Sequence, residues 1–175
     1  MNVIHVLPQR LASQIAAGEV IDRPASVVRE LIDNAIDAGT DRVSVEIGKG
    51  GRASIRVADR GVGMSREDLA LCVERHATSK IRSAEDLSAI RTLGFRGEAL
   101  PSIASVSRFS ITSRPHHEIA ALRLEMEGGG RRTITEAGAP PGTTVDVRDL
   151  FFNLPARRKF LRADRTEGRY VVDTV

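Results

Sequence analysis

The sequence has little cysteine, few aromatic residues and no long hydrophobic run. Its single cysteine, Cys72, cannot form an internal disulfide, and no cysteine–histidine spacing suggests zinc, so we expect a buried helix residue there. Aromatic residues make up only 3% of the chain, which argues against binding of single-stranded nucleic acid by base stacking. Without a bilayer-length apolar run or the pattern of a secretion signal at residues 1–8, we expect a cytoplasmic protein with no membrane partner.

Lysine is also scarce, because 23 of the 26 basic residues are arginine and the net charge is only +3. Arginine binds phosphate and carboxylate groups through two parallel hydrogen bonds, so phosphate-bearing partners are permitted. Residues 148–170 carry a net charge of +4, and the rest of the chain sums to −1. This basic stretch suggests DNA phosphate contacts, although a solvated arginine-rich helix explains it at least as well.

The 175 residues, 41% hydrophobic and 28% charged, are typical of one soluble globular domain. Hydrophobic spacing and capping residues predict helices and strands that follow one another along the chain. Apolar residues alternate with polar ones at 43–47 (Val, Val, Ile) and at 53–57 (Ala, Ile, Val), so the glycine-rich residues 48–51 should join an antiparallel hairpin. The pattern indicates an α/β two-layer sandwich. The remaining predictions are helices at 9–20, 24–38 and 98–105, short helices after Ser65 and Ser83, and strands within 106–148 that turn Phe109, Ile111, Leu122, Leu124, Val145 and Val147 to one face.

The predicted helix at 24–38 has a polar face opposite an apolar stripe formed by residues 27, 28, 31, 32, 35 and 36. Glu30, Asp33, Asn34 and Asp37 recur on that face at helical spacing. Glu30 could take a proton from an attacking water, and Asn34 could complete a hydrated magnesium shell without acting as a base. By spacing alone, a solvated helix face is the more common explanation.

Two glycine-containing loops are the other candidates. Asp59-x-Gly61-x-Gly63 leaves a predicted strand, and an Asp there can accept a hydrogen bond from a purine amino group while the glycines leave room for the ring; ordinary turns also use Asp and Gly. Residues 94–100 (Gly-Phe-Arg-Gly-Glu-Ala-Leu) enter a helix whose free N–H groups favour an anion. The polar residues 76–80 could add donors, and no Walker-type phosphate loop occurs.

Taken in order, Glu30-x-x-x-Asn34, Asp59-x-Gly61-x-Gly63, residues 94–100 and residues 142–145 resemble the four ATP-site motifs of the GHKL superfamily. That superfamily includes gyrase-type topoisomerases, heat-shock chaperones, sensor histidine kinases and the MutL family of mismatch-repair proteins. Residues 14–20, 23–28, 75–81 and 155–161 resemble the MutL family in particular. The departures are Asp33, Arg29 and Leu154, where that family more often has Glu, Lys and Thr.

The resemblance implies a Bergerat-type ATP site, in which a mixed, largely antiparallel sheet carries helices on one face. It also implies ATP and Mg²⁺ as cofactors. Glu30 resembles the general base, Asn34 the magnesium ligand, Asp59 the acceptor of the adenine amino group, and Thr143 a threonine that supports adenine recognition, usually through water. The remaining nucleotide-binding residues by resemblance are Gly61 and Gly63, the phosphate-side residues Thr78, Ser79 and Lys80, and the lid residues Arg96, Gly97, Ala99 and Leu100.

For function, the resemblance implies an ATP-driven switch that links a mismatch-recognition protein to downstream strand-processing enzymes and binds DNA without reading its sequence. ATP would order the lid and an N-terminal arm at residues 1–20, and two N-terminal regions of a homodimer would then close on each other. Residues 170–175 resemble the middle of a helix or strand, because no Gly, Pro or polar cap ends them, so we expect a fragment of a longer protein. We expect this fragment alone to be a poor ATPase. The alternatives are the ATPase domain of another GHKL class and a non-catalytic DNA-binding scaffold.

Overall fold

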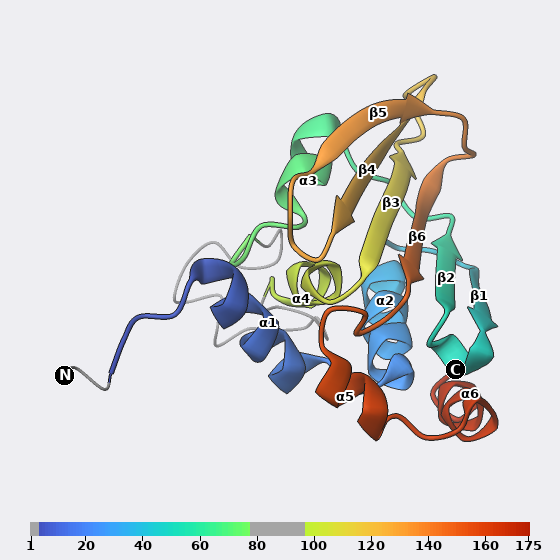
Figure 1. Cartoon of the computed structure of the whole chain (residues 1–175). Coiled ribbons are helices and arrows are strands. Elements are labelled where there is room, and N and C mark those ends of the chain that lie inside the picture. Colours follow the sequence, from blue (N-terminus) through green and yellow to red (C-terminus); the bar gives the residue numbers. More distant parts are fainter. Residues whose placement is uncertain (1–3, 78–96) are drawn as a thin grey trace, which may run out of the picture.

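The computed structural model describes residues 4–77 and 97–175, which form a sheet and the helices packed on it (Figure 1). The helices are α1 (Gln9–Val20), α2 (Pro24–Asp37), the 3-10 turn η1 (Lys49–Gly51), α3 (Arg66–Leu71), α4 (Ala99–Ser105), α5 (Pro155–Phe160) and α6 (Asp164–Val172). The strands are β1 (Val43–Gly48), β2 (Ser54–Asp59), β3 (Arg108–Arg114), β4 (Ala121–Glu127), β5 (Thr133–Ala137) and β6 (Gly142–Arg148).

The six strands lie in the order β1-β2-β6-β3-β4-β5, and every neighbouring pair is antiparallel. The predicted hairpin is confirmed as β1 and β2 joined through η1. Helix α2 packs on β1 and β2, α4 packs on β3 and β4, and α1 packs on α4 (Figure 1). The predicted two-layer sandwich is therefore confirmed, and among the described strands the expected mixed sheet is antiparallel throughout.

The core lies between the sheet and the helices, on the face that strand alternation predicts. Ile111 lies opposite both Val145 and Leu124 across the sheet, Phe109 lies opposite Val147, and all five side chains are buried. The sixth predicted core residue of these strands, Leu122, is half-buried against the same cluster. The inward face of these strands is thus as predicted.

Helix α2 begins with Pro24 at its first position, and Gly39, just beyond its end, has a φ of +74°. The predicted apolar stripe is buried at Val27, Val28, Leu31 and Ala35. Ile36, however, is 53% exposed, because it lies about 100° further round the helix than Ala35 and so passes the edge of the packed face. The stripe is narrower than predicted.

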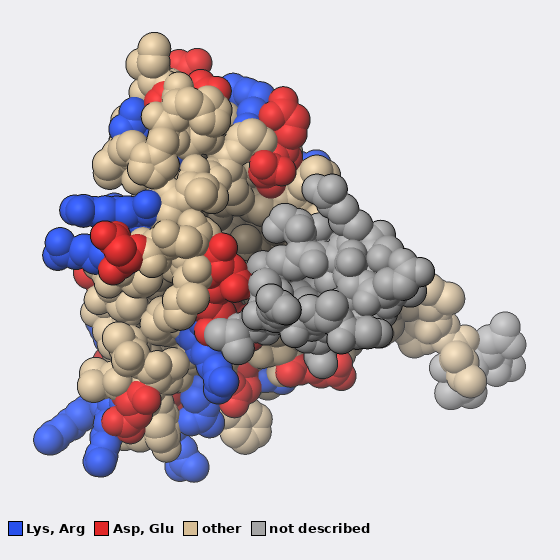
Figure 2. Space-filling view, turned by 180° about the vertical axis from the view of Figure 1, so that it is seen from behind, with Lys and Arg blue, Asp and Glu red and all other residues tan. Residues whose placement is uncertain are grey.

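The basic stretch at 148–170 folds into two short helices, α5 and α6, rather than one solvated helix. Some of its charged side chains belong to the fold: Arg157 donates to the backbone oxygen of Gly18 at 2.8 Å, and Glu167 is only 1% exposed. On the face turned away in Figure 1, basic and acidic side chains are intermixed (Figure 2). Helix α6 ends at Val172 with Asp173 as its C-cap, so the expectation that residues 170–175 lie inside one element holds only as far as Val172.

Two smaller predictions concern α3. Ser65 caps this helix by accepting from the N–H of Asp68 at 3.1 Å, as predicted. Cys72 is not inside the helix but at its C-cap, where it is half-buried and its thiol lies 3.2 Å from the Leu69 carbonyl oxygen. Within the described part of the chain, no helix has the length and apolar character needed to cross a membrane.

Candidate functional site

Three neighbouring strands, β2, β6 and β3, change from apolar to polar at the same end of the sheet. Val57, Val145 and Ile111 are buried against the helices, and Asp59, Thr143 and Ser113 each lie two residues away on the same strands. Because side chains alternate along a strand, these three polar residues share the helix-facing side. They form a polar cluster where the core ends.

Asp59 is the centre of this cluster. Its Oδ1 atom accepts hydrogen bonds from the N–H groups of Gly61 at 2.8 Å and Thr143 at 3.2 Å. Its other oxygen, Oδ2, has no hydrogen-bond partner among residues 4–77 and 97–175. Burial raises the pKa of Asp59 above its ordinary value, although the two N–H groups act in the opposite direction. The site thus presents one oriented carboxylate oxygen for a donor group of a ligand.

The two glycines after Asp59 are required by the protein's own backbone. A Cβ on Gly61 would lie 2.7 Å from the Cβ and the carbonyl oxygen of Ala38, at the end of α2. Gly63 has a φ of +72°, and a Cβ there would meet the backbone of Arg114. The glycines therefore bring the loop against α2 and β3, in addition to any room they leave for a ligand.

Ser113 is a member of the cluster that the sequence analysis missed. Its hydroxyl accepts from the N–H of Met64 at 2.8 Å and lies 2.9 Å from the Thr143 hydroxyl. The side chain is 1% exposed. The sequence does contain a signal for it, because Ser113 places a polar residue at the next inward-facing position after Phe109 and Ile111.

Glu30 and Asn34 lie on α2, which the Asp59 loop contacts through a hydrogen bond from the N–H of Val62 to the Ala38 carbonyl (3.1 Å). Asn34 is about 6 Å and Glu30 about 12 Å along the helix from Ala38, at 1.5 Å per residue. Both side chains are half-buried, and the Asn34 amide makes no hydrogen bond to another described residue. The two residues share one helix face.

A magnesium site at this place would rest on few protein ligands. In the described residues no group of three or more His, Cys, Asp or Glu side chains is placed to hold a metal ion. Mg²⁺ commonly keeps several waters and takes only one or two protein oxygens when it is bound with a phosphate ligand. The unengaged carboxamide of Asn34 fits that kind of site.

The predicted phosphate-side residues are described only in part. Gly97, Ala99 and Leu100 lie at the start of α4, and Gly97 has a φ of +61°. A Cβ on Gly97 would meet the backbone of Ala77, so these two residues lie against each other. The first N–H groups of a helix have no acceptor inside it, so α4 leaves donors at this end. Thr78, Ser79, Lys80 and Arg96 lie outside the described residues, as does the predicted short helix after Ser83.

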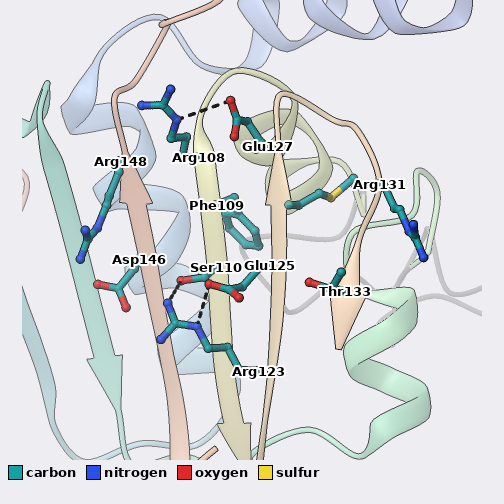
Figure 3. Close-up of a pocket in the computed structure, with 11 residues that line it drawn as sticks. Arg108, Phe109, Ser110, Arg123, Glu125, Glu127, Arg131, Thr133, Asp146 and Arg148 are labelled. Carbon is teal, nitrogen blue, oxygen red and sulfur yellow. Dashed lines mark hydrogen bonds and ion pairs between the residues drawn. The ribbon is translucent and has the colours of Figure 1, made fainter. Parts of the chain in front are cut away.

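A hollow of about 390 Å³ lies elsewhere, on the open face of the sheet (Figure 3). Figure 3 shows charged side chains over strands β3, β4 and β6, with Arg123 hydrogen-bonded to Ser110 and Glu125 at 3.2 Å each. Asp146 alternates with the core residues Val145 and Val147, so this face is opposite the helices. Of the predicted nucleotide-binding residues that the structure describes, none lines the hollow.

Comparison with known proteins agrees with this arrangement. Residues 22–135 match the model of the histidine kinase-, DNA gyrase B- and HSP90-like ATPase family. The chain is 56% identical over 98% of its length to the DNA mismatch repair protein MutL of Syntrophotalea carbinolica, and 57% identical over its full length to that of Heliobacterium modesticaldum. It covers 27% and 26% of those two proteins, about a quarter of their length.

Solved structures give the same result. The MutL ATPase domain of Aquifex aeolicus, complexed with ADP, matches with a TM-score of 0.69 and 40% identity over 88% of this chain and 53% of that chain. The N-terminal domain of a DNA repair protein matches with a TM-score of 0.73 and 30% identity, over 93% of this chain and 46% of that chain. The chain therefore belongs to the histidine kinase-, DNA gyrase B- and HSP90-like ATPase family, in its MutL mismatch-repair branch.

Proposed function

We propose that this chain binds ATP with Mg²⁺ at the Asp59 cluster and hydrolyses it as part of a DNA mismatch repair protein. The observation that carries the proposal is the carboxylate of Asp59, which the N–H groups of Gly61 and Thr143 hold by one oxygen while the other has no partner among the described residues. An oriented acceptor of this kind suits the amino group of adenine. The ADP complex of the Aquifex aeolicus MutL ATPase domain supports a nucleotide as the ligand.

Within this site we assign the phosphate end to α2 and the start of α4. Asn34 would hold Mg²⁺, which would neutralise phosphate charge when bound. Glu30, one helical turn from Asn34 and on the same face, would take the proton of the attacking water. Gly97, Ala99 and Leu100 would offer backbone N–H groups, and Thr78, Ser79, Lys80 and Arg96 would complete the surroundings of the phosphates.

At the level of the whole protein, we propose an ATP-driven switch. Nucleotide binding would order the N-terminal arm (residues 1–20) and close two copies of a homodimer, and this state would couple a mismatch-recognition protein to strand-processing enzymes on DNA in the cytoplasm. The chain covers about a quarter of its MutL relatives. We therefore expect weak nucleotide binding and slow hydrolysis from these 175 residues alone, and a steady-state rate equal to that of a longer chain would contradict this.

The test is a thermal-unfolding titration with a non-hydrolysable ATP analogue, with and without Mg²⁺, on the native chain and on Asp59→Asn. Ligand at about 100 times its dissociation constant adds roughly 2.7 kcal/mol of stability, which corresponds to an increase in Tm of about 5–11 °C for a chain of this size. We expect this increase in the native chain and not in Asp59→Asn.

Two further variants separate binding from chemistry. Asn34→Ala should retain analogue binding but lose its dependence on Mg²⁺, and Glu30→Gln should bind the analogue while hydrolysing no ATP. If millimolar nucleotide stabilises neither this chain nor a longer one, the proposed ATP site is wrong.

A further inference from the structure

The hydroxyl of Ser113 lies within hydrogen-bonding distance of three different groups. The N–H of Met64 is 2.8 Å away, the carbonyl oxygen of Gly142 is 3.2 Å away, and the hydroxyl of Thr143 is 2.9 Å away. Only 1% of Ser113 is exposed. Its hydrogen-bonding capacity is therefore used inside the protein rather than on water.

Only one arrangement of the protons makes all three of these contacts hydrogen bonds at once. A serine hydroxyl has one proton and two lone pairs. The Met64 N–H can only donate and the Gly142 carbonyl can only accept, so in that arrangement Ser113 accepts from Met64 and donates its proton to Gly142. Its remaining lone pair then accepts the proton of Thr143. In this arrangement all three contacts are hydrogen bonds, and Thr143 has no proton left for a ligand.

This arrangement sets the polarity of the ligand-facing cluster. The backbone N–H of Thr143 donates to Asp59 Oδ1 at 3.2 Å, so the Thr143 side chain belongs to the same cluster as the unengaged oxygen of Asp59. Thr143 Oγ1 and Asp59 Oδ2 are then both hydrogen-bond acceptors. At the exocyclic position of the base, two acceptors favour an amino group, which donates, over a carbonyl, which cannot.

We propose that Ser113 is a positioning residue that holds the Thr143 hydroxyl as an acceptor and so helps the site select adenine over hypoxanthine. The proposal rests on the proposed function, because it requires the base of a nucleotide to lie beside Asp59. Ser113 itself touches no ligand and acts through Thr143 and through the loop at Met64.

The experiment measures calorimetric dissociation constants for ADP and IDP. Adenine has an exocyclic amino group where hypoxanthine has a carbonyl, and hypoxanthine also carries a proton on the adjacent ring nitrogen. We expect the native chain to prefer ADP. In Ser113→Ala the Thr143 proton is released and can turn toward the carbonyl of IDP, so the preference should fall about fivefold, the effect of one ordinary hydrogen bond. A merely structural role of Ser113 would instead weaken both nucleotides by the same factor, and that result would overturn the proposal.

A matched control and a second variant make the test specific. Ser107→Ala removes a hydroxyl that is equally buried and donates to the Ile103 carbonyl at 2.7 Å, away from the cluster, and should leave the ADP:IDP ratio unchanged. Thr143→Val should lower the ratio by itself, and Ser113→Ala added to it should change the ratio no further. If Ser113→Ala does not fold, an unchanged ratio in Thr143→Val still overturns the proposal.

The outcomes also separate this inference from the proposed function. If the native chain binds both nucleotides equally, the proposed nucleotide site still holds but the proposed role of Ser113 is wrong. A native chain, and a longer one, that bind neither nucleotide would overturn both.

Discussion

The contact between Gly18 and Arg157 predicts a substitution whose effect on stability changes sign with its background. Gly18 is buried in the last turn of α1, and Arg157 of α5 donates to its carbonyl oxygen at 2.8 Å. The guanidinium carbon of Arg157 also lies 5.8 Å from the centre of the Phe151 ring. For a Cβ built on Gly18, the three nearest atoms all belong to the Arg157 guanidinium, at 2.5–3.0 Å.

Two opposing terms determine the effect of Gly18→Ala. Alanine is favoured over glycine inside a helix by about 1 kcal/mol. The added methyl group must displace the guanidinium, which loses a hydrogen bond from a charged donor worth roughly 1.5–3 kcal/mol. We therefore expect Gly18→Ala to destabilise the native chain by about 1 kcal/mol, or about 2–4 °C in Tm.

In the Arg157→Ala background the space beside Gly18 is open, and only the helix term remains. The same Gly18→Ala substitution should then stabilise the protein by about 1 kcal/mol. Thermal and urea unfolding of the native chain, the two single variants and the double variant measure both effects as a double-mutant cycle. If Gly18→Ala has the same sign in both backgrounds, the guanidinium does not hold the end of α1 as the structure shows.

Three more predictions concern single residues. Burial raises the pKa of the Cys72 thiol to about 12, so iodoacetamide at pH 8 should label the folded protein about a thousandfold more slowly than the urea-unfolded chain; equal rates would contradict this burial. Gly63→Ala should lower the free energy of unfolding by more than about 1 kcal/mol, because the φ of +72° and the Arg114 backbone both oppose a side chain; urea unfolding measures it, and a neutral effect would refute the close approach. Burial also raises the pKa of Asp59, so its contribution to stability is full below the pKa of the unfolded chain and is lost as pH rises through the folded pKa. Ligand-free Asp59→Asn, which stays neutral, should therefore be more stable than the native chain at pH 7 and equal to it near pH 3, and a less stable Asn variant at pH 7 would contradict the direction of the shift.

Much of the fold follows from local patterns in the sequence. Helix α2 begins at Pro24 and stops before Gly39 because those two residues favour the start and the end of a helix. The β1–β2 hairpin and the inward faces of β3, β4 and β6 follow from alternation, which strand geometry imposes on every half-buried strand. The one miss on α2, the exposed Ile36, arises because helical periodicity locates an apolar face but not its width.

The candidate site could also be predicted only in part from the sequence. Its individual motifs are visible in the sequence, since Asp59, Gly61 and Gly63 lie within five residues of one another. Asp59 and Thr143, however, are separated by 84 residues and meet through a hydrogen bond only because β6 pairs with β2. The place of β3 beside β6 then brings Ser113 to Thr143, a contact that no spacing in the sequence indicates.

For the basic stretch at 148–170, the sequence alone did not predict what the charged side chains contact. Its composition suggested phosphate contacts or a solvated helix, yet Arg157 donates to a carbonyl 139 residues earlier in the chain. By itself, the sequence determined which segments are helices and strands and which faces they bury, because those properties depend on residues only a few positions apart. The tertiary structure decided which polar groups meet, because strand order and helix packing bring together residues that are far apart in the chain.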